Sequence, residues 1–469
     1  MRIIWSQNMC GGAVELDCMG ARRGYARGVA VRGVGFLVGG IDDLLVDLVY
    51  LARRLTGFGR RLRLDRLPLP RTPGRFAVFV PAWDEVGVIR AMLSAAIERI
   101  EHPDYRIYVG CYPNDPATIE AVRSVADHRV RLVIGPRPGP TTKGDNLNAL
   151  WRALLADDAR DGVTTRAVVL HDAEDVIDPA ELRVFDALLD RHAVIQLPVH
   201  PLIRPDAWAV SGTYADEFAE AHGKMLVVRG AIGAGLPLAG VGCAIRRDAL
   251  AALAATRGGA PFDAESLTED YEMGLHLARL GYTGCFARVT NGRGELVATR
   301  AYFPDDLASA VRQKARWMTG IALAGWDRTG WSWPLALADH WMRARDRRAP
   351  LAVLVLAAAY AALLLWGVAG VAFWLTEAEH PPLDPMLARV LAINAALLGW
   401  RLALRVGFTW RAYGWREGLR AAPRLFVGNL ISLLAVRRAV WRYVGMLRGS
   451  APVWDKTAHR FPELEPQRA

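Results

Sequence analysis

The chain has 469 residues and a net charge of +10, and arginine carries almost all of the positive charge. Its mean hydropathy is positive, and its last third contains long apolar runs. These features argue against a purely soluble protein. Much of the arginine flanks the apolar segments, so the charge indicates anchoring at a membrane and not binding to nucleic acid. The five cysteines show no C-x-x-C spacing, which argues against a zinc centre or a disulfide framework and is typical of a reducing compartment.

The first predicted elements are a leader and an apolar helix. Residues 1–27 show no clear cleavable signal pattern, and we expect them to be poorly ordered. Residues 28–54 are long enough to cross a bilayer, but they contain Arg32, Asp42, Asp43 and Asp47. We favour a spanning helix; a partly inserted interfacial helix and a linker helix without a membrane role are the alternatives. Residues 55–74, rich in arginine and proline, are predicted to be a linker along the membrane surface.

Residues 75–326 show short apolar runs that alternate with helical patterns. The runs predicted to be strands are RFAVFVPAWDE, RIYVGCYP, RVRLVIG, AVVLHDAED and AVIQLPVHP. Strands alternating with helices predict an α/β fold with a mostly parallel sheet that is covered on both faces. Ligands of such sheets bind at the carboxyl ends of the strands, so the acids that end these runs are candidate site residues.

The remainder of the chain is predicted to be a basic amphipathic connector (327–349), a membrane region (350–447) and a tail (448–469). Within the membrane region, 350–375 and 385–410 are predicted spans, whereas 425–447 is either a short span or a membrane-surface helix. The loop TEAEHPPLD between the two spans has no lysine or arginine, and the flanking segments are rich in arginine. The positive-inside rule therefore predicts that the domain at 75–326 is cytoplasmic.

Acidic residues follow the predicted strands. PAWDE places Asp84 and Glu85 after the first strand, CYPNDP places Asp115 after the second, and LHDAEDVIDP places Asp172 and Glu174 on alternate positions after a buried strand. A pair spaced like D-x-D can direct two carboxylates at one divalent cation, with phosphate oxygens completing its shell. Acids at strand ends are also common loop residues, so each of them alone is weak support.

A second motif is QKARW, in which Gln313, Arg316 and Trp317 fall at i, i+3 and i+4 and share one face of a helix. An amide, a guanidinium and an indole together can bind a pyrophosphate and stack on a sugar ring. The alternative is an interfacial helix that uses the tryptophan as a membrane anchor. Lys143, in TTKGDNLNAL, is a weaker candidate for a phosphate contact.

The stretch SLTEDYEMGLHLARLGY is predicted to begin a helix. Ser266 and Glu269 have the S-x-x-E spacing of a capping box, and Met273 and Leu277 follow at helical spacing. Asp270 is thus either an acid at a helix start or a catalytic base.

Taken in order, these motifs resemble the processive-type membrane glycosyltransferases of family 2, whose signature is D, D-x-D, T-E-D and Q-x-x-R-W. The resemblance covers about 76–326. LTEDYEMGL, QKARWMTGIAL and WDKTAHRFP resemble, more narrowly, the NfrB-like phage-adsorption glycosyltransferases of bacterial inner membranes. Such proteins often continue into a regulatory domain that binds cyclic di-GMP; this chain stops at Ala469, so we expect it to lack that element or to obtain it from another chain.

The resemblance implies a GT-A fold and a set of site residues. The T-E-D pair implied to be catalytic is Glu269 and Asp270, with Asp270 as the general base. Asp172 and Glu174 match the motif that holds Mg²⁺ or Mn²⁺, with glutamate in place of the second aspartate. The residues implied to bind substrate are Pro81, Ala82, Asp84, Glu85, Asp115, Lys143, Gln196, Gln313, Arg316 and Trp317.

The implied activity is inverting transfer of a hexosyl or N-acetylhexosaminyl group from a nucleotide-diphosphate donor, a UDP-sugar, to a polysaccharide, another glycan or a lipid-linked acceptor. The implied location is the bacterial inner membrane, in contact with membrane lipids. The two or three predicted spans are few for an enzyme that builds its own export channel, which suggests a partner export pore. The competing hypotheses are a catalytically silent membrane scaffold or receptor component, and a lipid-phosphate sugar transferase.

Overall fold

The structure is a computed structural model that describes residues 35–57, 61–71, 73–377, 384–450 and 459–463. The predicted leader, residues 28–34 of the predicted apolar helix, much of the acidic loop and most of the tail lie outside these ranges. The chain divides into two compact units, described separately below. The larger unit consists of Leu48–Pro350 with Leu404–Ala469, and the smaller of Met1–Asp47 with Leu351–Ala403.

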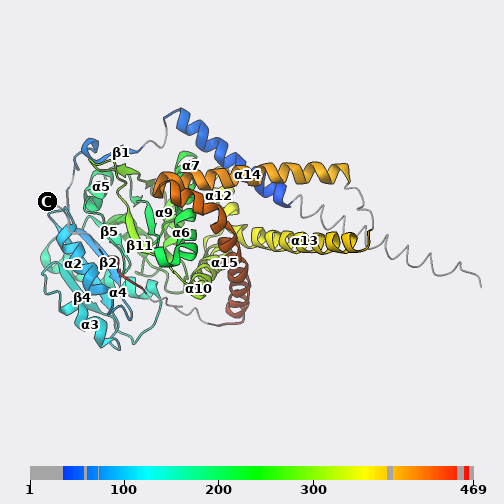
Figure 1. Cartoon of the computed structure of the whole chain (residues 1–469). Helices are drawn as coiled ribbons and strands as arrows, with labels where there is room; N and C mark the ends of the chain where they lie inside the picture. The colour runs from blue at the N-terminus through cyan, green and yellow to red at the C-terminus, as the bar shows by residue number, and fades with distance from the viewer. Residues whose placement is uncertain (1–34, 58–60, 72, 378–383, 451–458, 464–469) are drawn as a thin grey trace, which may run out of the picture. The chain divides into compact units, whose positions relative to one another are not determined.

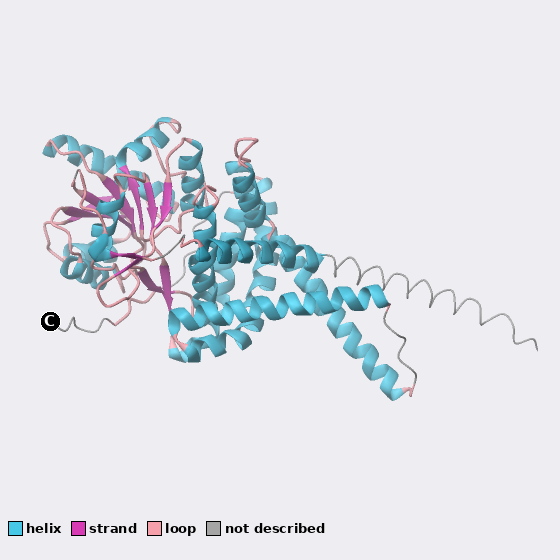
Figure 2. Ribbon diagram, turned by 90° about the horizontal axis from the view of Figure 1, so that it is seen from above, coloured by secondary structure: helices cyan, strands magenta, loops and turns pink. Residues whose placement is uncertain are grey.

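The larger unit is built on a seven-stranded sheet (Figures 1 and 2). In spatial order the strands are β4 (Val130–Ile134), β3 (Tyr105–Cys111), β2 (Phe76–Pro81), β5 (Ala167–Leu170), β8 (Cys243–Arg246), β6 (Val194–Gln196) and β9 (Gly284–Phe286). β8 runs antiparallel to both of its neighbours, and every other pairing is parallel. The mostly parallel sheet that the sequence predicts is confirmed.

The internal strand β2 is buried on both faces, which explains its continuous apolar sequence. Phe76, Val78 and Val80 belong to one hydrophobic cluster, and Ala77 and Phe79 belong to the other, because successive side chains of a strand alternate between faces. The helices α2 (Ile89–Arg99) and α4 (Lys143–Asp161) contribute side chains to these two clusters, one helix to each. The sheet is therefore covered on both sides, as expected.

The remaining elements of the larger unit up to α12 are short strands and helices. The short strands are β1 (Leu62–Arg63), which pairs with β10 (Val289–Thr290), and β7 (Val199–Leu202), which pairs with β11 (Thr299–Tyr302). The remaining helical elements are η1 (Leu64–Arg66), α3 (Pro116–Arg123), α5 (Glu181–Leu188), η2 (Pro205–Ala207), α6 (Trp208–Glu220), α7 (Leu226–Ala231), α8 (Arg247–Ala255), α9 (Glu269–Arg279), α10 (Leu307–Met318), α11 (Gly325–Thr329) and α12 (Leu337–Arg347). Two π-helical turns, η3 (Ala221–Met225) and η4 (Thr319–Ala324), follow α6 and α10 directly.

The predicted capping box at Ser266 is wrong. α9 begins at Glu269, its N-cap position is Thr268, and no side chain caps it. The Ser266 hydroxyl instead accepts the N–H of Thr268 (3.1 Å) and donates to Glu272 (2.7 Å). The serine is thus engaged by a carboxylate in the first turn of the helix and is not available to the N–H groups at the helix start.

Three helices in the described part of the chain are long and apolar enough to cross a membrane: α13 (Ala349–Leu375), α14 (Pro385–Tyr413) and α15 (Trp415–Leu447). The chain therefore has the features of a membrane protein. α15 packs along α10 and α6, and the small side chains Ala315, Ala435 and Ala439 meet at that contact.

Residues 35–55 form a further helix, which is not among those three. Within the smaller unit its charges have partners on α14: Arg401 donates to Asp43 (2.8 Å), and the Trp400 indole donates to Asp47 (2.8 Å). Acids in such a helix are thus satisfied by protein groups, as charges at membrane depth require.

Candidate active site

A cleft with a volume of about 710 Å³ lies at the carboxyl edge of the sheet in the larger unit. Most of the predicted site residues line it: Pro81, Glu85, Lys143, Asp172, Glu174, Glu269, Asp270, Gln313, Arg316 and Trp317. The structure thus brings together side chains from the ends of β2 and β5, the start of α4, the start of α9 and one face of α10. Ala82, Asp84, Asp115 and Gln196 are not among the residues that line the cleft.

The centre of the cleft is a partly buried lysine surrounded by acids. Lys143 is the first residue of α4, and its ammonium donates to Asp172 Oδ1 at 2.5 Å. Burial alone would lower the pKa of Lys143, but the carboxylates of Asp172, Glu269 and Asp270 outweigh burial and raise it. The lysine is therefore held charged, and this group of charges carries an excess of carboxylates.

Asp270 has the setting that a general base needs. Burial raises its pKa above the ordinary aspartate value, while the charge of Lys143 opposes the shift. Burial, followed by the charge of Asp270, raises the pKa of Glu269 to about 7. A carboxylate whose pKa lies nearer to neutral is a stronger proton acceptor at working pH than an exposed one.

Gly240 makes the space for this carboxylate. Its φ is +76°, and a Cβ at this position would lie 2.5 Å from Asp270 Oδ2. Gln196 fixes the same loop from behind: its amide donates to the carbonyl of Val241 (2.9 Å) and accepts the N–H of Ala239 (2.8 Å). Gln196 therefore positions the loop beside Asp270 without lining the cleft.

Asp115 also supports the cleft indirectly, through hydrogen bonds to the backbone of neighbouring segments. One carboxylate oxygen accepts the N–H of Thr118 (3.2 Å) at the start of α3, and the other accepts the N–H of Asp84 (2.6 Å). Asp84 has a φ of +53°, which is uncommon for a residue other than glycine. Ala82 is buried and donates its N–H to the carbonyl of Gly110 (2.8 Å). Together these bonds fix the turn after β2 that places Glu85 in the cleft.

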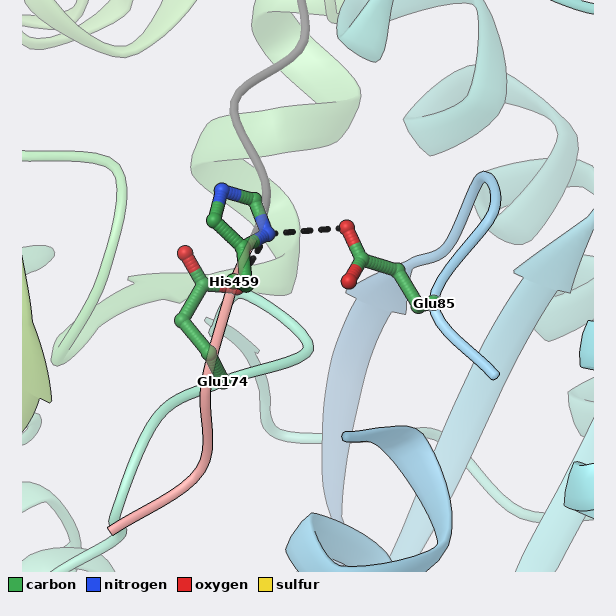
Figure 3. Close-up of side chains that lie close together, drawn as sticks. All are labelled: Glu85, Glu174 and His459. Carbon is green, nitrogen blue, oxygen red and sulfur yellow. Dashed lines mark hydrogen bonds and ion pairs between the residues drawn. The ribbon is translucent and has the colours of Figure 1, made fainter. Parts of the chain in front are cut away.

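The metal-motif acids face different partners. Asp172 is held by Lys143, whereas Glu174 lies beside Glu85 and His459, as Figure 3 shows. The His459 ring nitrogen Nδ1 lies 2.9 Å from Glu85 Oε1 and 3.3 Å from Glu174 Oε2. Burial, together with nearby acids, raises the pKa of Glu174 to about 8, although His459 opposes that shift.

Glu85, Glu174 and His459 have the side-chain types and spacing that fit a divalent cation. Donor atoms of Glu85, Glu174 and His459 lie within 4.8 Å of one another. Glu174 Oε2 is buried without a hydrogen-bond donor among the described residues. The histidine was not among the predicted site residues. It stands in WDKTAHRFP, a segment that is distinguished only by its resemblance to a family, and no local pattern links it to a residue 374 positions earlier.

A buried hydrogen-bond network supports the loop that carries Asp172 and Glu174. The His171 ring contacts Asp175 (Nδ1, 2.9 Å) and Glu181 (Nε2, 2.7 Å), and Asp175 also accepts the N–H of Asp172 (2.9 Å). Burial would lower the pKa of His171, but Glu181 and Asp175 raise it to about 10, so the imidazolium donates from both nitrogens. This network fixes the backbone that presents Asp172 and Glu174.

The opposite wall of the cleft is α10. Gln313, Arg316 and Trp317 all line the cleft, so they share one helix face as their spacing predicts. Gln313 Oε1 is buried without a partner in the described part of the chain, so it is an acceptor available to a ligand. The Trp317 ring belongs to an aromatic cluster with Tyr214, Phe218 and Phe303 at centroid distances of 6.0, 6.3 and 6.4 Å.

The two motif segments approach each other closely at one point. A Cβ on Gly320, in the π-helical turn that follows α10, would lie 2.5 Å from the Thr268 hydroxyl at the start of α9. A side chain at position 320 would therefore separate the two walls.

Comparisons with known proteins agree with the sequence motifs. A family profile described as "Glycosyltransferase like family 2" matches residues 73–320. The chain is 36% identical over 455 residues to Bacteriophage adsorption protein B of Escherichia coli K12. The alignment covers 91% of this chain and 61% of that protein. Bacteriophage N4 adsorption protein B of Escherichia coli O157:H7 gives the same values. The chain thus spans about 61% of the length of the curated relatives that it matches.

Among solved structures, the mannosyltransferase PcManGT from Pyrobaculum calidifontis, in complex with GDP-Man and Mn²⁺, is similar over 86% of this chain and 99% of its own length. The TM-score is 0.50 and the sequence identity 19%. At this identity the likeness concerns the fold, and it confirms the predicted GT-A-like fold.

Proposed function

The chain belongs to glycosyltransferase family 2, and on that premise we propose that it transfers a hexose or N-acetylhexosamine from a UDP-sugar to a glycan acceptor, with inversion at the anomeric carbon. The observation that carries the proposal is the pairing of two walls in one cleft. Asp270 and Lys143 stand on one wall, and Gln313, Arg316 and Trp317 stand on the other.

Asp270 is the proposed base. It takes the proton of the acceptor hydroxyl while the acceptor oxygen forms a bond to the anomeric carbon. The bond from that carbon to the diphosphate breaks in the same step, and UDP leaves with the electron pair. Direct displacement with one base inverts the anomeric configuration and needs no covalent intermediate. The raised pKa of Asp270 supports this role.

The leaving diphosphate needs positive charge. Arg316 can bind it in a bidentate manner, and Gln313 can contact it or the sugar. When bound, Mg²⁺ or Mn²⁺ supplies Lewis-acid neutralisation of the diphosphate. Asp172 and Glu174 are the proposed ligands from the metal motif. Pro81, with Glu85 beyond the turn that Asp115 fixes, bounds the proposed nucleotide side.

The acceptor side is more apolar. The aromatic cluster around Trp317 offers rings on which a pyranose can stack. We propose a polysaccharide or other glycan acceptor at the bacterial inner membrane, with the larger unit in the cytoplasm, because arginine-rich segments flank α13 and α14. Export of a product would use a partner pore. Purification from gently solubilised membranes without any companion protein would contradict that last point.

The test is release of UDP from a panel of UDP-sugars by the full chain in nanodiscs, with Mg²⁺, Mn²⁺ or EDTA and with Asp270→Asn as the control. We expect metal-dependent release from one donor, and loss of that release in the variant. NMR of the product gives the anomeric configuration, and retention would refute direct displacement.

Two outcomes favour the competing functions. If the folded protein neither binds UDP nor releases it from any donor, the chain acts as a membrane scaffold or receptor component. If polyprenyl phosphate alone serves as acceptor, the chain is a lipid-phosphate sugar transferase.

A further inference from the structure

Four arginines from distant parts of the sequence come together in the larger unit, away from the motif residues of the cleft. Arg54 lies in the last turn of the helix at 35–55, and Arg411 lies in the last turn of α14. Arg61 and Arg288 directly precede the paired strands β1 and β10, and the N–H of Leu62 donates to the carbonyl of Arg288 (2.8 Å). The group is here named the arginine cluster.

Packing between these segments fixes the position of the cluster. The Tyr50 ring meets the Phe408 ring edge to face, with 5.6 Å between the centroids. Phe408 in turn lies against the π-helical turn η3, where a Cβ on Gly223 would be 2.7 Å from its ring. The helix at 35–55, the end of α14 and η3 are thus in contact, and the arginines that they carry or border are held near one another by the fold.

The arginine cluster has no carboxylate partner among the residues that the structure describes. The side chain of Arg288 makes one long hydrogen bond, to the carbonyl of Gly223 (3.5 Å). The Nε atoms of Arg61 and Arg288 are buried, and neither has an acceptor in the described ranges. A buried donor without an acceptor is costly, so these two atoms indicate a ligand that supplies oxygen atoms.

The charges of the cluster repel one another. Burial, followed by the charge of Arg61, lowers the pKa of Arg288 to about 10. Burial, followed by the charges of Arg411 and Arg54, also lowers the pKa of Arg61. The guanidinium groups nevertheless stay protonated at neutral pH, so the cluster carries four positive charges that an anion would stabilise.

We propose that the arginine cluster binds the phosphate group of an anionic membrane lipid. The planar donors of a guanidinium match phosphate oxygens in pairs, and two unsatisfied Nε–H groups are present for such a contact. The proposal does not depend on the function proposed above, because it uses none of the residues assigned to transfer.

The surroundings of the cluster favour a lipid over a soluble anion. α14, which ends beside Arg411, is long and apolar enough to cross a membrane. Exposed apolar side chains lie next to the two helix-end arginines in the sequence: Leu51 (42% exposed), Leu55 (88%) and Trp410 (56%). Arginine beside exposed tryptophan and leucine at the end of an apolar helix is typical of the membrane interface, where lipid phosphates lie.

The experiment places the full chain in phosphatidylcholine nanodiscs that contain a trace of spin-labelled phosphatidylglycerol or spin-labelled phosphatidylcholine. Electron paramagnetic resonance measures the fraction of each labelled lipid that the protein immobilises. We expect the wild type to prefer phosphatidylglycerol. The double variant Arg61→Gln with Arg288→Gln should lower that preference by at least about tenfold, since each arginine at a membrane surface contributes a factor of about five.

A matched control separates a site from general surface charge. Arg416→Gln with Arg437→Gln removes the same charge from α15, where both side chains are exposed, and it should leave the preference nearly unchanged. The first double variant should melt no lower than the wild type in phosphatidylcholine, because it removes repulsion. If it melts lower, Arg411→Gln carries the test, since Arg411 is exposed and its replacement leaves the core intact; a loss of about fivefold is expected.

Three outcomes overturn the proposal. The same preference in the wild type and in the cluster variants shows that the arginines bind no lipid. Equal losses in the cluster and control double variants show attraction to the whole basic surface and not a site. A third arm adds inorganic pyrophosphate to the protein in detergent. A melting temperature that pyrophosphate raises only when Arg61 and Arg288 are present, with no preference for phosphatidylglycerol, assigns the cluster to a soluble anion.

Discussion

Two clusters of charged side chains, each buried in part, differ in their charge balance within the described part of the larger unit. In the first, here named the cleft cluster, three carboxylates surround one cation; its members are Lys143, Asp172, Glu269 and Asp270. The second, here named the strut cluster, joins α15 to α6 and pairs two carboxylates with two arginines; its members are Asp216, Glu417, Arg420 and Arg424.

The strut cluster satisfies its charges completely. Arg424 donates to Asp216 from two nitrogens (2.9 and 2.7 Å) and to Glu417 (2.5 Å), and its side chain is fully buried. Gly212 leaves the space, since a Cβ there would lie 2.4 Å from the guanidinium. Bidentate geometry of this kind fixes one helix against another.

The cleft cluster has the opposite property. Burial, together with the neighbouring carboxylates, keeps the pKa values of Glu269 and Asp270 raised, so these two acids are ready to accept protons or cations from a ligand. The comparison teaches that buried charge by itself does not mark a functional site. An imbalance of buried charge, beside a cleft, is the feature that indicates chemistry.

The largest expected effect is on the base. Asp270→Asn should lower kcat by roughly 10²–10⁴-fold, because the side chain can no longer accept a proton. It should leave the melting temperature unchanged or raised, because it removes an excess charge. Turnover of UDP-sugar and thermal unfolding in the same detergent check both points. Near-normal turnover would remove Asp270 from the mechanism.

A substitution in the strut cluster should lower the stability of the protein. Arg424→Met leaves Asp216 buried without its cation and should cost roughly 3–5 kcal/mol of stability. Thermal unfolding should show a fall of roughly 10 °C. The double variant Arg424→Met with Asp216→Leu should recover most of the loss. If the single variant melts like the wild type, the strut cluster does not hold α15.

Gly240 tests the space around the base. In Gly240→Ala the added Cβ meets Asp270, and the positive φ adds strain of about 1–3 kcal/mol. We expect lower kcat as well as lower stability. Gly258→Ala is the matched control, since Gly258 has a φ of +65° and open space around it. Equal loss of kcat in the two variants would show that strain, and not the contact, is responsible.

The excess acid predicts a dependence of stability on pH. The pKa of Glu269 is raised on folding from 4.5 to about 7 by burial and by Asp270. An acid of this kind binds its proton more tightly in the folded state, so its stabilising contribution is full below pH 4.5 and is lost as pH rises through about 7. Between these values the wild type should lose about 1–3 kcal/mol relative to Glu269→Gln. Melting curves across pH measure the difference, and parallel curves would contradict the raised pKa.

The smallest effect is expected at Ser266, outside both clusters. Ser266→Ala removes the two hydrogen bonds that order the segment before α9, and it should cost about 1 kcal/mol with little change in kcat. Ser124→Ala is the control, because that hydroxyl makes an exposed bond to the carbonyl of Ala121. A large loss of activity in Ser266→Ala would mean that the segment also orients the base.

Local patterns were sufficient to predict much of this structure. β2 and β5 are buried on both faces, so they appear as unbroken apolar runs, and Gln313, Arg316 and Trp317 share a face because helical spacing requires it. The acids after these strands come together because parallel strands end at one edge of the sheet.

The remainder depends on contacts that no local pattern encodes. β8 runs antiparallel between β5 and β6, and its sequence alone does not state its direction. The strut cluster joins residues 208 positions apart. The roles of Asp115 and Gln196 as supports for neighbouring loops become visible only when their hydrogen-bond partners are known.

The contact between His459 and Glu85 also restricts how the chain threads a bilayer. The two residues lie together although α13, α14 and α15 separate them along the sequence. A chain that leaves one side of a membrane and returns to it crosses an even number of times. If α13 and α14 form one pair of crossings, parity predicts that α15 remains on the side of the cleft, where it packs along α10 and α6. An even number of crossings thus favours the membrane-surface alternative for 425–447. The position of His459 beside Glu85 is the observation that requires the even number.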